Sequence, residues 1–544
     1  MKHPDSVGKV ILKTLREKPL LSLGILAAVV GAIVMALLPP FLLGQLIDAL
    51  TAGQALPLVP VILYYVFLAL SGITESLREG LLTVFGQKIT HALRSSLMDK
   101  YTRLTTNALT AQEPGTVVSR FVGDVDTVEN LFTSGIVSMF ADACKILSIL
   151  GVICFQNRGL ALVLLLLLPF LFLFTRTVQK RMLSAQIENR KAVGKTSAYV
   201  PETVHNIRTI HNLSKESYME SRYDEAIVDS FKAVEKTNFY DAIYSPVIKI
   251  LNAAVVGIVM LFSASGSPAA LTLFGMSAGT AVAVINYISQ IFTPVESLGM
   301  EIQTIQSAVA GVHRINEFFR LEERQEVPVE AAPQSGSVDF RNVTFAYDGE
   351  EAHAVLKNKS FSVNEGEQVT LTGRTGAGKS TIFKLLLGLY EPQAGQVLIG
   401  SVPVSHIANA DRRRVFGYVE QTFHMVPGTV RDQITLFDPE ISTEAVEKAA
   451  AMVGLDAVIG QLDRGCDTIC TPDLFSQGQW QLLSIARAIA ADPKLLLLDE
   501  ITASMDAETE KQVLLALQKS AAHRTVLSIS HRLQAEMGRN IAIS

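Results

Sequence analysis

The chain has 544 residues, of which 49% are hydrophobic and only 18% are charged, so it is too long for one ordinary core and too apolar for a purely water-soluble protein. Its formal net charge of −5 argues against a nucleic-acid partner, which usually demands a basic surface. Four scattered cysteines are too few for a disulfide framework, and we expect all of them to be reduced.

The first 320 residues predict an all-α polytopic membrane domain. A helix that crosses a bilayer needs roughly 20 predominantly apolar residues. Runs of this kind occur six times, at about residues 20–46, 58–82, 132–155, 159–178, 244–264 and 273–299.

The segments between these runs differ in charge. Residues 83–131 and 179–243 are long and rich in Lys and Arg, whereas the other connections are short and hold a single basic residue, Arg158. Because cytoplasmic loops carry an excess of basic residues, we expect both long segments and both termini in the cytoplasm of a bacterium, with the spans in its inner membrane. Apolar residues at helical spacing in the long segments predict that the spans continue as helices beyond the bilayer.

Ionisable side chains interrupt several of the predicted spans. Glu75 lies in the second, Asp142 and Lys145 lie in the third, and Glu296 lies in the sixth. A charge at the bilayer centre costs roughly 2.5 kcal/mol or more on insertion scales, so such groups face a cavity or a partner. These four residues are candidates for a substrate path. The alternative is structural pairing, since Asp142 and Lys145 are three residues apart on one helix face.

The composition changes after the sixth span. Residues 321–336 are rich in Glu, Pro, Ser and Gly without periodicity, which predicts a linker between a membrane domain (1–320) and a second domain (337–544). In the second domain, alternating apolar residues are followed by apolar runs that alternate with helical stretches. This pattern predicts a soluble α/β domain.

A glycine-rich loop carries the strongest chemical signal. It follows the strand-like run 368–372 and opens a helical run, and its residues are Gly373, Arg374, Thr375, Gly376, Ala377, Gly378, Lys379, Ser380 and Thr381. Backbone N–H groups of such a loop surround phosphate oxygens, while Lys379 reaches the outer phosphates and Ser380 can ligate Mg²⁺. The pattern predicts a P-loop that binds ATP.

A second motif lies further along the same domain. The apolar run Leu495–Leu498 is typical of a buried strand, and it delivers Asp499 and Glu500 at its carboxyl end. Asp499 would hold Mg²⁺, and Glu500 would act as the general base that polarises the attacking water.

Between these motifs, Phe475–Gln479 reads Phe-Ser-Gln-Gly-Gln and leads into a helical run. With this stretch the chain resembles an ATP-binding cassette (ABC) transporter, in the half-transporter arrangement of the exporter fold, over nearly its whole length. In that family the corresponding signature contacts the nucleotide that the opposite subunit binds. The resemblance implies this role for Ser476, Gln477, Gly478 and Gln479.

The same resemblance implies further roles by position. Tyr347 would stack on adenine. Gln421 would sense Mg²⁺ and the attacking water, and His531 would touch the γ-phosphate and hold Glu500 in place. Asp506 would lie in a loop that communicates between two ATP sites.

The signature departs from the family pattern at three positions. Gln477 replaces the middle glycine, Phe475 replaces the leading leucine, and Trp480 replaces the usual basic residue. Ser476 and Gly478 are retained, so the resemblance implies a weakened signature. A heterodimer whose second subunit has a weaker site would account for this change, and a homodimer is the alternative.

Taken together, the sequence predicts an ATP hydrolase that moves a small molecule or peptide through the lipid bilayer by alternating access, with a second half-transporter as partner and with ATP and Mg²⁺ bound. Export is the expected direction. Two alternatives are the uptake of a metal chelate or nutrient by the same fold, and an ATP-gated channel or regulator. The retained Glu500 and His531 favour a pump, because gating needs binding more than fast turnover.

Overall fold

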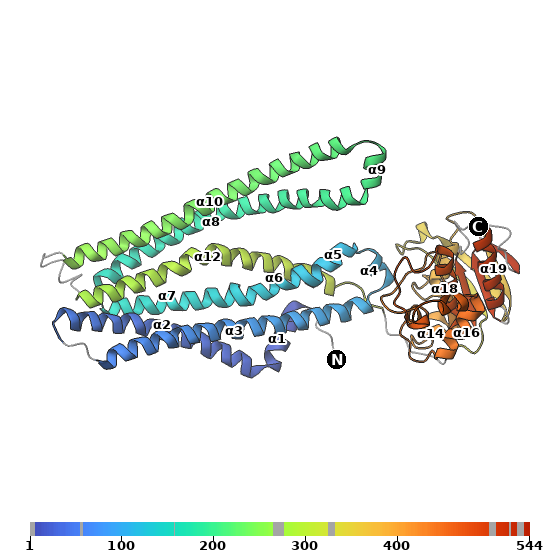
Figure 1. The fold of residues 1–544 in the computed structure, drawn as a ribbon, viewed down its shortest axis with the longest axis horizontal. Helices are drawn as coiled ribbons and strands as arrows, with labels where there is room; N and C mark the ends of the chain where they lie inside the picture. The colour runs from blue at the N-terminus through green and yellow to red at the C-terminus, as the bar shows by residue number, and fades with distance from the viewer. Residues whose placement is uncertain are drawn as a thin grey trace. The chain divides into compact units, whose positions relative to one another are not determined.

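The computed structural model describes residues 6–54, 58–156, 158–264, 277–324, 332–499, 507–521, 524–529 and 538–543. The chain forms two compact units. The first consists of Met1–Thr102 and Gln112–Leu321, and the second consists of Arg103–Ala111 and Glu322–Ser544. The first unit is helical and the second contains both helices and strands (Figure 1), which confirms the predicted combination of an all-α domain and an α/β domain.

The first unit is built from long helices and a few short ones. They are α1 (Val7–Glu17), α2 (Pro19–Thr51), α3 (Leu58–Arg103), α5 (Pro114–Ser119), η1 (Arg120–Asp124), α6 (Val125–Asn130), η2 (Leu131–Gly135), α7 (Ile136–Gln156), α8 (Arg158–His205), α9 (Ile207–Asn212), α10 (Glu216–Ala264) and α12 (Ala278–Phe319).

Five helical segments among the described residues are long and apolar enough to cross a membrane. They are Pro19–Thr51, Leu58–Arg103, Pro114–Phe155, Glu216–Ile258 and Ala278–Val295. The expected span at 159–178 falls within α8, where several side chains lie outside the described residues. Residues 273–276 of the last expected span also lie outside them, and α12 begins at Ala278.

Three helices are much longer than a bilayer requires. α3 has 46 residues, α8 has 48 and α10 has 49. At about 1.5 Å per residue each is roughly 70 Å long, more than twice the thickness of a hydrocarbon core. α8 and α10 lie side by side and are joined through the short α9 (Figure 1). The spans therefore continue as helices well beyond the bilayer, as expected.

The third span contains two π-helical segments, η1 and η2, inside one continuous helix from Pro114 to Gln156. The carboxylate of Asp124 in η1 is buried, and Arg314 Nε of α12 donates to both of its oxygens at 3.0 Å. Gly311 of α12 lies so close that a Cβ there would stand 2.4 Å from Thr127 Oγ1. This helix and α12 are therefore tightly fixed to each other.

The second unit contains two sheets. The first is a four-stranded antiparallel sheet in the order β2-β1-β4-β5, and the second is a five-stranded parallel sheet in the order β6-β7-β8-β3-β9. Their bounds are β1 (Val338–Phe345), β2 (Leu356–Val363), β3 (Gln368–Thr372), β4 (Ala394–Ile399), β5 (Val402–Pro403), β6 (Phe416–Val419), β7 (Leu495–Asp499), β8 (Thr525–Ile529) and β9 (Arg539–Ala542).

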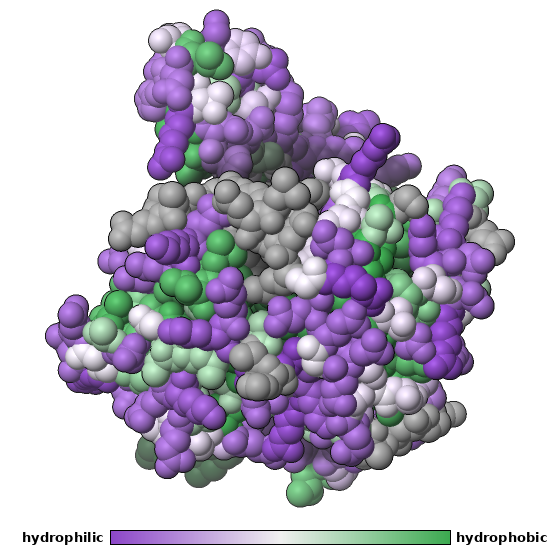
Figure 2. Space-filling view, turned by 90° about the vertical axis from the view of Figure 1, so that its right-hand side faces the viewer, coloured by the Kyte–Doolittle hydropathy of each residue, from purple (hydrophilic) through white to green (hydrophobic). Residues whose placement is uncertain are grey.

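Helices cover this parallel sheet. The helices of the second unit are α4 (Thr106–Thr110), η3 (Glu351–His353), α13 (Lys379–Leu386), η4 (Val404–His406), α14 (Arg412–Val415), α15 (Val430–Thr435), α16 (Thr443–Val453), α17 (Asp456–Gly460), η5 (Gly465–Asp467), α18 (Gln477–Ile489) and α19 (Ala507–Ala521). Figure 2, which looks onto the second unit, shows a mostly hydrophilic surface with small hydrophobic areas.

Two hydrophobic cores lie on opposite faces of the parallel sheet. Leu496 and Leu498 of β7 pack into a core that includes α16, α18 and α19. Leu495 and Leu497 pack into the other core, with α13 and strands of the antiparallel sheet. A strand buried on both faces needs apolar residues at every position. This arrangement explains the continuous run of leucines before Asp499.

Candidate functional site

The glycine-rich loop connects β3 to α13 through backbone conformations that side chains rarely adopt. The φ angles of Gly373, Gly376 and Gly378 are 150°, 86° and 93°. A Cβ on Gly373 would lie 2.3 Å from Ile543 O, and a Cβ on Gly378 would lie 2.7 Å from Leu356 Cδ2. Only glycine fits at these two positions, so the loop is held in a tight turn at the N-terminus of α13. The partial positive charge of a helix N-terminus favours an anion there.

Lys379, the first residue of α13, spans this loop. Its side chain is buried, and its Nζ donates to Gly373 O at 2.8 Å and to Arg374 O at 3.1 Å. The next residue, Ser380, is exposed at the start of the helix, as are Gly373 to Gly376 in the loop. The lysine ammonium is thus fixed beside an accessible loop.

Tyr347 lies beside the same helix turn. Its hydroxyl is 3.0 Å from Thr381 Oγ1, and Lys384 Nζ donates to it at 3.3 Å. The ring is held edge-on by Phe345 and Tyr390, with centroids 5.0 and 5.3 Å away, yet 37% of the residue remains exposed. The structure therefore brings an accessible aromatic ring next to the glycine-rich loop, where a nucleotide base could stack.

The parallel sheet brings further candidate residues to the same edge. Because β3, β6, β7 and β8 are parallel, their carboxyl ends all point one way. The loop follows β3, Asp499 ends β7, and the exposed Gln421 comes two residues after β6. Ligands of open parallel sheets bind outside the carboxyl ends of the strands.

Tyr418 of β6 contacts this edge, although the sequence had not singled it out. Its hydroxyl donates to Asp499 Oδ2 at 3.2 Å. Burial, together with the charge of Asp499, raises the pKa of Tyr418 well above that of an ordinary phenol, so the hydroxyl stays protonated and remains a donor. The contact orients the carboxylate.

Three predicted residues, Glu500, Asp506 and His531, lie outside the described residues. In the sequence, Glu500 directly follows β7 and His531 comes two residues after β8. Both strands end at the edge that carries the glycine-rich loop.

The donor groups at this edge suit Mg²⁺. The hydroxyl of Ser380 and the carboxylate of Asp499 are oxygen ligands of the kind that Mg²⁺ prefers, together with substrate phosphates. Asp499 is only partly buried, and the Tyr418 hydroxyl donates to it. The residues present therefore fit a magnesium ion.

The Phe475–Gln479 stretch forms the beginning of α18. Ser476 is the N-cap, and its Oγ accepts from Gln479 N at 3.3 Å while Ser476 N donates to Gln479 Oε1 at 2.9 Å. This reciprocal pair is a capping box. Gly478 is buried, whereas Ser476 and Gln477 are exposed. The departure from glycine at Gln477 is therefore accommodated within this chain.

Aromatic side chains connect α18 to the segment that carries Gln421. Trp480 stacks on Phe423, with ring centroids 5.0 Å apart and planes at 25°. It also meets Phe475 edge-to-face, again at 5.0 Å. On Phe423, Arg487 of α18 places its Cζ 4.1 Å from the ring centroid. Trp480, one of the three departures from the family signature, thus joins two elements of the candidate site.

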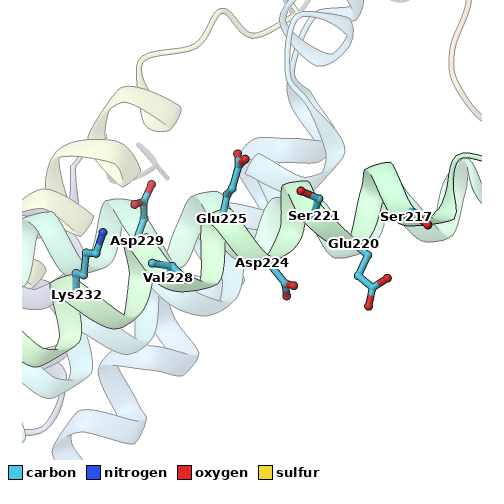
Figure 3. A pocket seen from close by; sticks show the side chains of 8 residues that line it. All are labelled: Ser217, Glu220, Ser221, Asp224, Glu225, Val228, Asp229 and Lys232. Carbon is cyan, nitrogen blue, oxygen red and sulfur yellow. The ribbon is translucent and has the colours of Figure 1, made fainter.

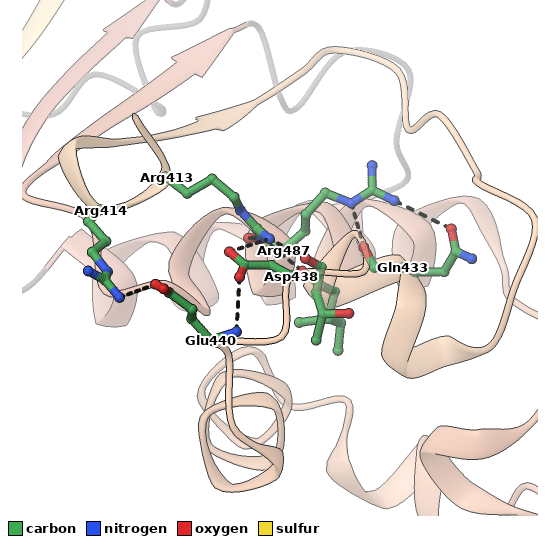
Figure 4. A network of polar contacts seen from close by, with 8 residues as sticks. Arg413, Arg414, Gln433, Asp438, Glu440 and Arg487 are labelled. Atoms are coloured by element: carbon green, nitrogen blue, oxygen red, sulfur yellow. Dashed lines mark hydrogen bonds and ion pairs between the residues drawn. The ribbon is translucent and has the colours of Figure 1, made fainter. Parts of the chain in front are cut away.

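Arg487 also anchors this segment through hydrogen bonds. It donates through Nε to Gln433 O at 2.6 Å, and through Nη1 to His424 O at 3.0 Å. Burial lowers the pKa of Arg487 to about 10, so the guanidinium remains protonated at neutral pH. Figure 4 shows Arg487 beside two ion pairs, Arg413 with Asp438 and Arg414 with Glu440.

In the first unit, three of the four predicted substrate-path residues line one cavity. It has a volume of about 210 Å³ and lies between α2, α3 and α7, where Glu75, Asp142 and Lys145 are joined by Arg78. Arg78 Nη2 donates to Glu75 Oε1 at 2.5 Å. The side chain of Glu296, the fourth candidate, lies outside the described residues.

A larger hollow, of about 720 Å³, lies along α10 and is lined by that helix alone. Its acidic side chains do not converge, because Glu220 and Asp224 point away from Glu225 and Asp229 (Figure 3). We interpret it as a solvated helix face.

Comparisons with known proteins identify the family of this chain. Residues 21–295 match the model for the ABC transporter transmembrane region, and residues 356–503 match the model for the ABC transporter. The chain belongs to the ABC transporter family. The family predicted from the sequence is therefore confirmed.

Its relatives align over most of their length. The putative ABC transporter ATP-binding protein exp8 of Streptococcus pneumoniae is 29% identical over 98% of this chain and 92% of its own. An ATP-dependent lipid A-core flippase of Pseudomonas fluorescens is 30% identical over 95% and 88%. A fatty acid ABC transporter ATP-binding/permease protein of Mycobacterium tuberculosis is 29% identical over 83% and 71%.

A solved structure shares the fold. A bacterial Atm1-family ABC exporter with ATP bound superimposes with a TM-score of 0.77 and 24% identity, over 97% of this chain and 94% of that one. The ABC transporter described here therefore has the exporter fold. It is an ATP-driven membrane transporter whose second unit binds and hydrolyses ATP, in agreement with the prediction from the sequence.

Proposed function

We propose that this chain is one half of a dimeric exporter, in which ATP held between two ATPase domains drives alternating access of a cavity in the membrane. One observation carries the proposal: the parallel sheet gathers the glycine-rich loop, Asp499 and Gln421 at a single edge. A nucleotide bound by the loop would lie next to the groups that hydrolysis requires.

In this proposal the residues of the loop bind the phosphates. The backbone of Gly373 to Thr381 surrounds them, Lys379 neutralises the outer ones, and Tyr347 stacks on the adenine. Ser380 and Asp499 would hold Mg²⁺, which would supply positive charge to the β- and γ-phosphates.

Hydrolysis would depend on the residues that follow the neighbouring strands. Glu500 would accept the proton of the attacking water, and His531 would hold Glu500 against the γ-phosphate. Gln421 would sense the occupied site, and Asp506 would relay its state to the second site.

The exposed signature supports a partner subunit. Ser476 and Gln477 stand at the accessible N-terminus of α18, where they would meet the nucleotide bound by a second half-transporter, together with Gly478 and Gln479. The partner would be a second copy of this chain or a different half-transporter. A different half-transporter whose own ATP site is weaker would account for the altered signature.

We further propose that the termini and the helical extensions face the cytoplasm and that the spans lie in a bacterial inner membrane. The basic segments 83–131 and 179–243 support this orientation. The cargo would be a small molecule or peptide. The names of two relatives, a lipid A-core flippase and a fatty acid transporter, favour a cargo with an apolar part.

The test uses the full-length protein in sealed vesicles. Glu500→Gln is expected to lower ATP hydrolysis by about 100-fold or more while ATP binding persists, because it removes only the general base. Glu444→Gln, at an exposed position of α16, serves as the matched control and keeps the wild-type rate.

Two results would contradict the proposal. Equal hydrolysis by the Glu500→Gln variant and the control would remove the assigned base. Steady leakage of an entrapped dye while ATP stays bound to Glu500→Gln would favour a gated channel instead of a pump.

A further inference from the structure

Two cavities in the membrane domain adjoin each other. The first, of about 210 Å³, lies between α2, α3 and α7, and the second, of about 230 Å³, extends toward α12. Ala36, Ser71 and Lys145 line both of them. Along one side runs an apolar wall from α2, formed by Val29, Ala32, Ile33, Ala36, Pro39, Pro40 and Leu43.

The charges in this site balance. Arg78 is paired with Glu75, and Asp142 stands one helical turn from Lys145. Two negative charges thus face two positive ones.

Hydrogen-bonding capacity remains in the site. Arg78 Nε and Gln290 Oε1 are buried without a hydrogen-bond partner among the described residues. Lys145, which lines both cavities, makes no hydrogen bond and no close ion pair with any residue that the structure describes. Leaving a buried polar group unpaired is energetically unfavourable. Arg78 and Gln290 can therefore offer hydrogen bonds to a molecule that enters the cavities.

We propose that these joined cavities bind a zwitterionic headgroup attached to an apolar body. The anionic group, a phosphate or carboxylate, pairs with Lys145, and the ammonium group pairs with Glu75 and Asp142. A ligand with a net charge would leave one charge uncompensated in a medium of low dielectric constant, whereas a zwitterion leaves none. The apolar body lies against the α2 wall.

This inference rests on the proposed function, because it treats the bound molecule as the cargo. Two sources share the chemistry: the headgroup of a membrane phospholipid, and a soluble zwitterion that enters from water. Cavities of this size hold a headgroup but not the chains of a lipid, which would have to leave through an opening between helices.

The experiment measures ATP hydrolysis by the full-length protein in nanodiscs of phosphatidylglycerol. One arm replaces increasing fractions of that lipid with phosphatidylethanolamine, and the other adds dissolved phosphoethanolamine. We expect stimulation by phosphatidylethanolamine if the ligand is a lipid, and by both probes if a soluble zwitterion suffices. No response to either probe overturns the inference.

Substitutions of cavity residues test whether the probes stimulate ATP hydrolysis by binding in these cavities. Lys145→Gln is expected to raise the half-maximal amount of the active probe about 10-fold, because it removes a charge-assisted hydrogen bond. Gln290→Leu, which changes no charge, is expected to raise it about three-fold. Lys191→Gln, at an exposed position outside the cavities, is the matched control. A Lys145→Gln variant that folds and responds like this control overturns the assignment.

A third comparison tests the ammonium position. Asp142→Asn, which removes a carboxylate assigned to the ammonium group, should weaken the response to phosphatidylethanolamine relative to the Lys191→Gln control. An Asp142→Asn variant that folds and responds like this control would contradict the ammonium position. If the lipid responses are absent but ATP hydrolysis still depends on Glu500, only this inference is refuted. If ATP hydrolysis does not depend on Glu500, the proposed function is refuted.

Discussion

The stack of Phe423 on Trp480 makes a prediction that can be followed directly, because Trp480 is the only tryptophan in the chain. Replacing Phe423 with leucine keeps an apolar side chain but removes the ring. An aromatic pair contributes about 0.5–1.5 kcal/mol beyond burial, and a cation over a ring contributes about 0.5–1 kcal/mol at a partly exposed position. The Phe423→Leu variant loses both contacts, so we expect a local destabilisation of about 1–2.5 kcal/mol.

The assay is the intrinsic fluorescence of the full-length protein in detergent. In the Phe423→Leu variant the emission of Trp480 should shift to longer wavelength, since one face of the indole becomes accessible to water. The fluorescence transition in urea should move to a lower midpoint. ATP hydrolysis should fall several-fold, because the segment that carries Gln421 is held less firmly.

Phe437→Leu is the matched control, because Phe437 is 62% exposed in the same unit. Its emission and midpoint should equal those of the wild-type protein. If Phe423→Leu also leaves both quantities unchanged, Trp480 does not pack on Phe423 in solution. The proposed connection between α18 and the Gln421 segment would then be wrong.

Three further predictions concern single side chains. Lys379→Ala should weaken the binding of a fluorescent ATP analogue at least about 10-fold, because the ammonium group at the loop is lost. Unchanged binding would contradict the assignment of the glycine-rich loop as the ATP site. Tyr418→Phe removes a hydrogen bond to the Asp499 carboxylate, and hydrogen bonds to charged groups contribute about 1.5–3 kcal/mol. ATP hydrolysis at limiting Mg²⁺ should therefore fall roughly 10-fold. Restoration of hydrolysis by excess Mg²⁺ would support a role of Tyr418 in metal binding. Burial raises the pKa of Cys470 to about 11. Below that pH the thiolate fraction rises about ten-fold per pH unit. The rate of alkylation by iodoacetamide should therefore also rise about ten-fold per pH unit between pH 7 and 9. A rate that levels off near pH 8 would refute this environment.

The parts of the fold that depend on local patterns could be predicted from the sequence. The run Leu495–Leu498 indicated a strand buried on both faces, and both cores contact it. The glycines of the P-loop indicated a turn that side chains would obstruct, as Gly373 and Gly378 show. Helical spacing beyond the apolar runs indicated the long extensions of α3, α8 and α10.

The remaining features depend on which distant segments meet. Tyr418 contacts Asp499 only because β6 pairs with β7, and strand order cannot be read from the sequence of either strand. Trp480 looked like a departure from a motif until the structure placed Phe423 against it. Glu75 and Asp142 were recognised one by one, whereas their shared cavity requires the packing of three helices.

In the proposed dimer, the capping box at Ser476 would affect how fast the two ATPase domains close and reopen. The oxygen of its hydroxyl accepts from the helix backbone, whereas the hydroxyl hydrogen is not used by that cap. An arriving phosphate can therefore gain a donor without displacing any existing bond. Binding and release of the phosphate at this point need no local unfolding. The N-terminus of α18 can therefore bind and release a phosphate in each round of ATP turnover.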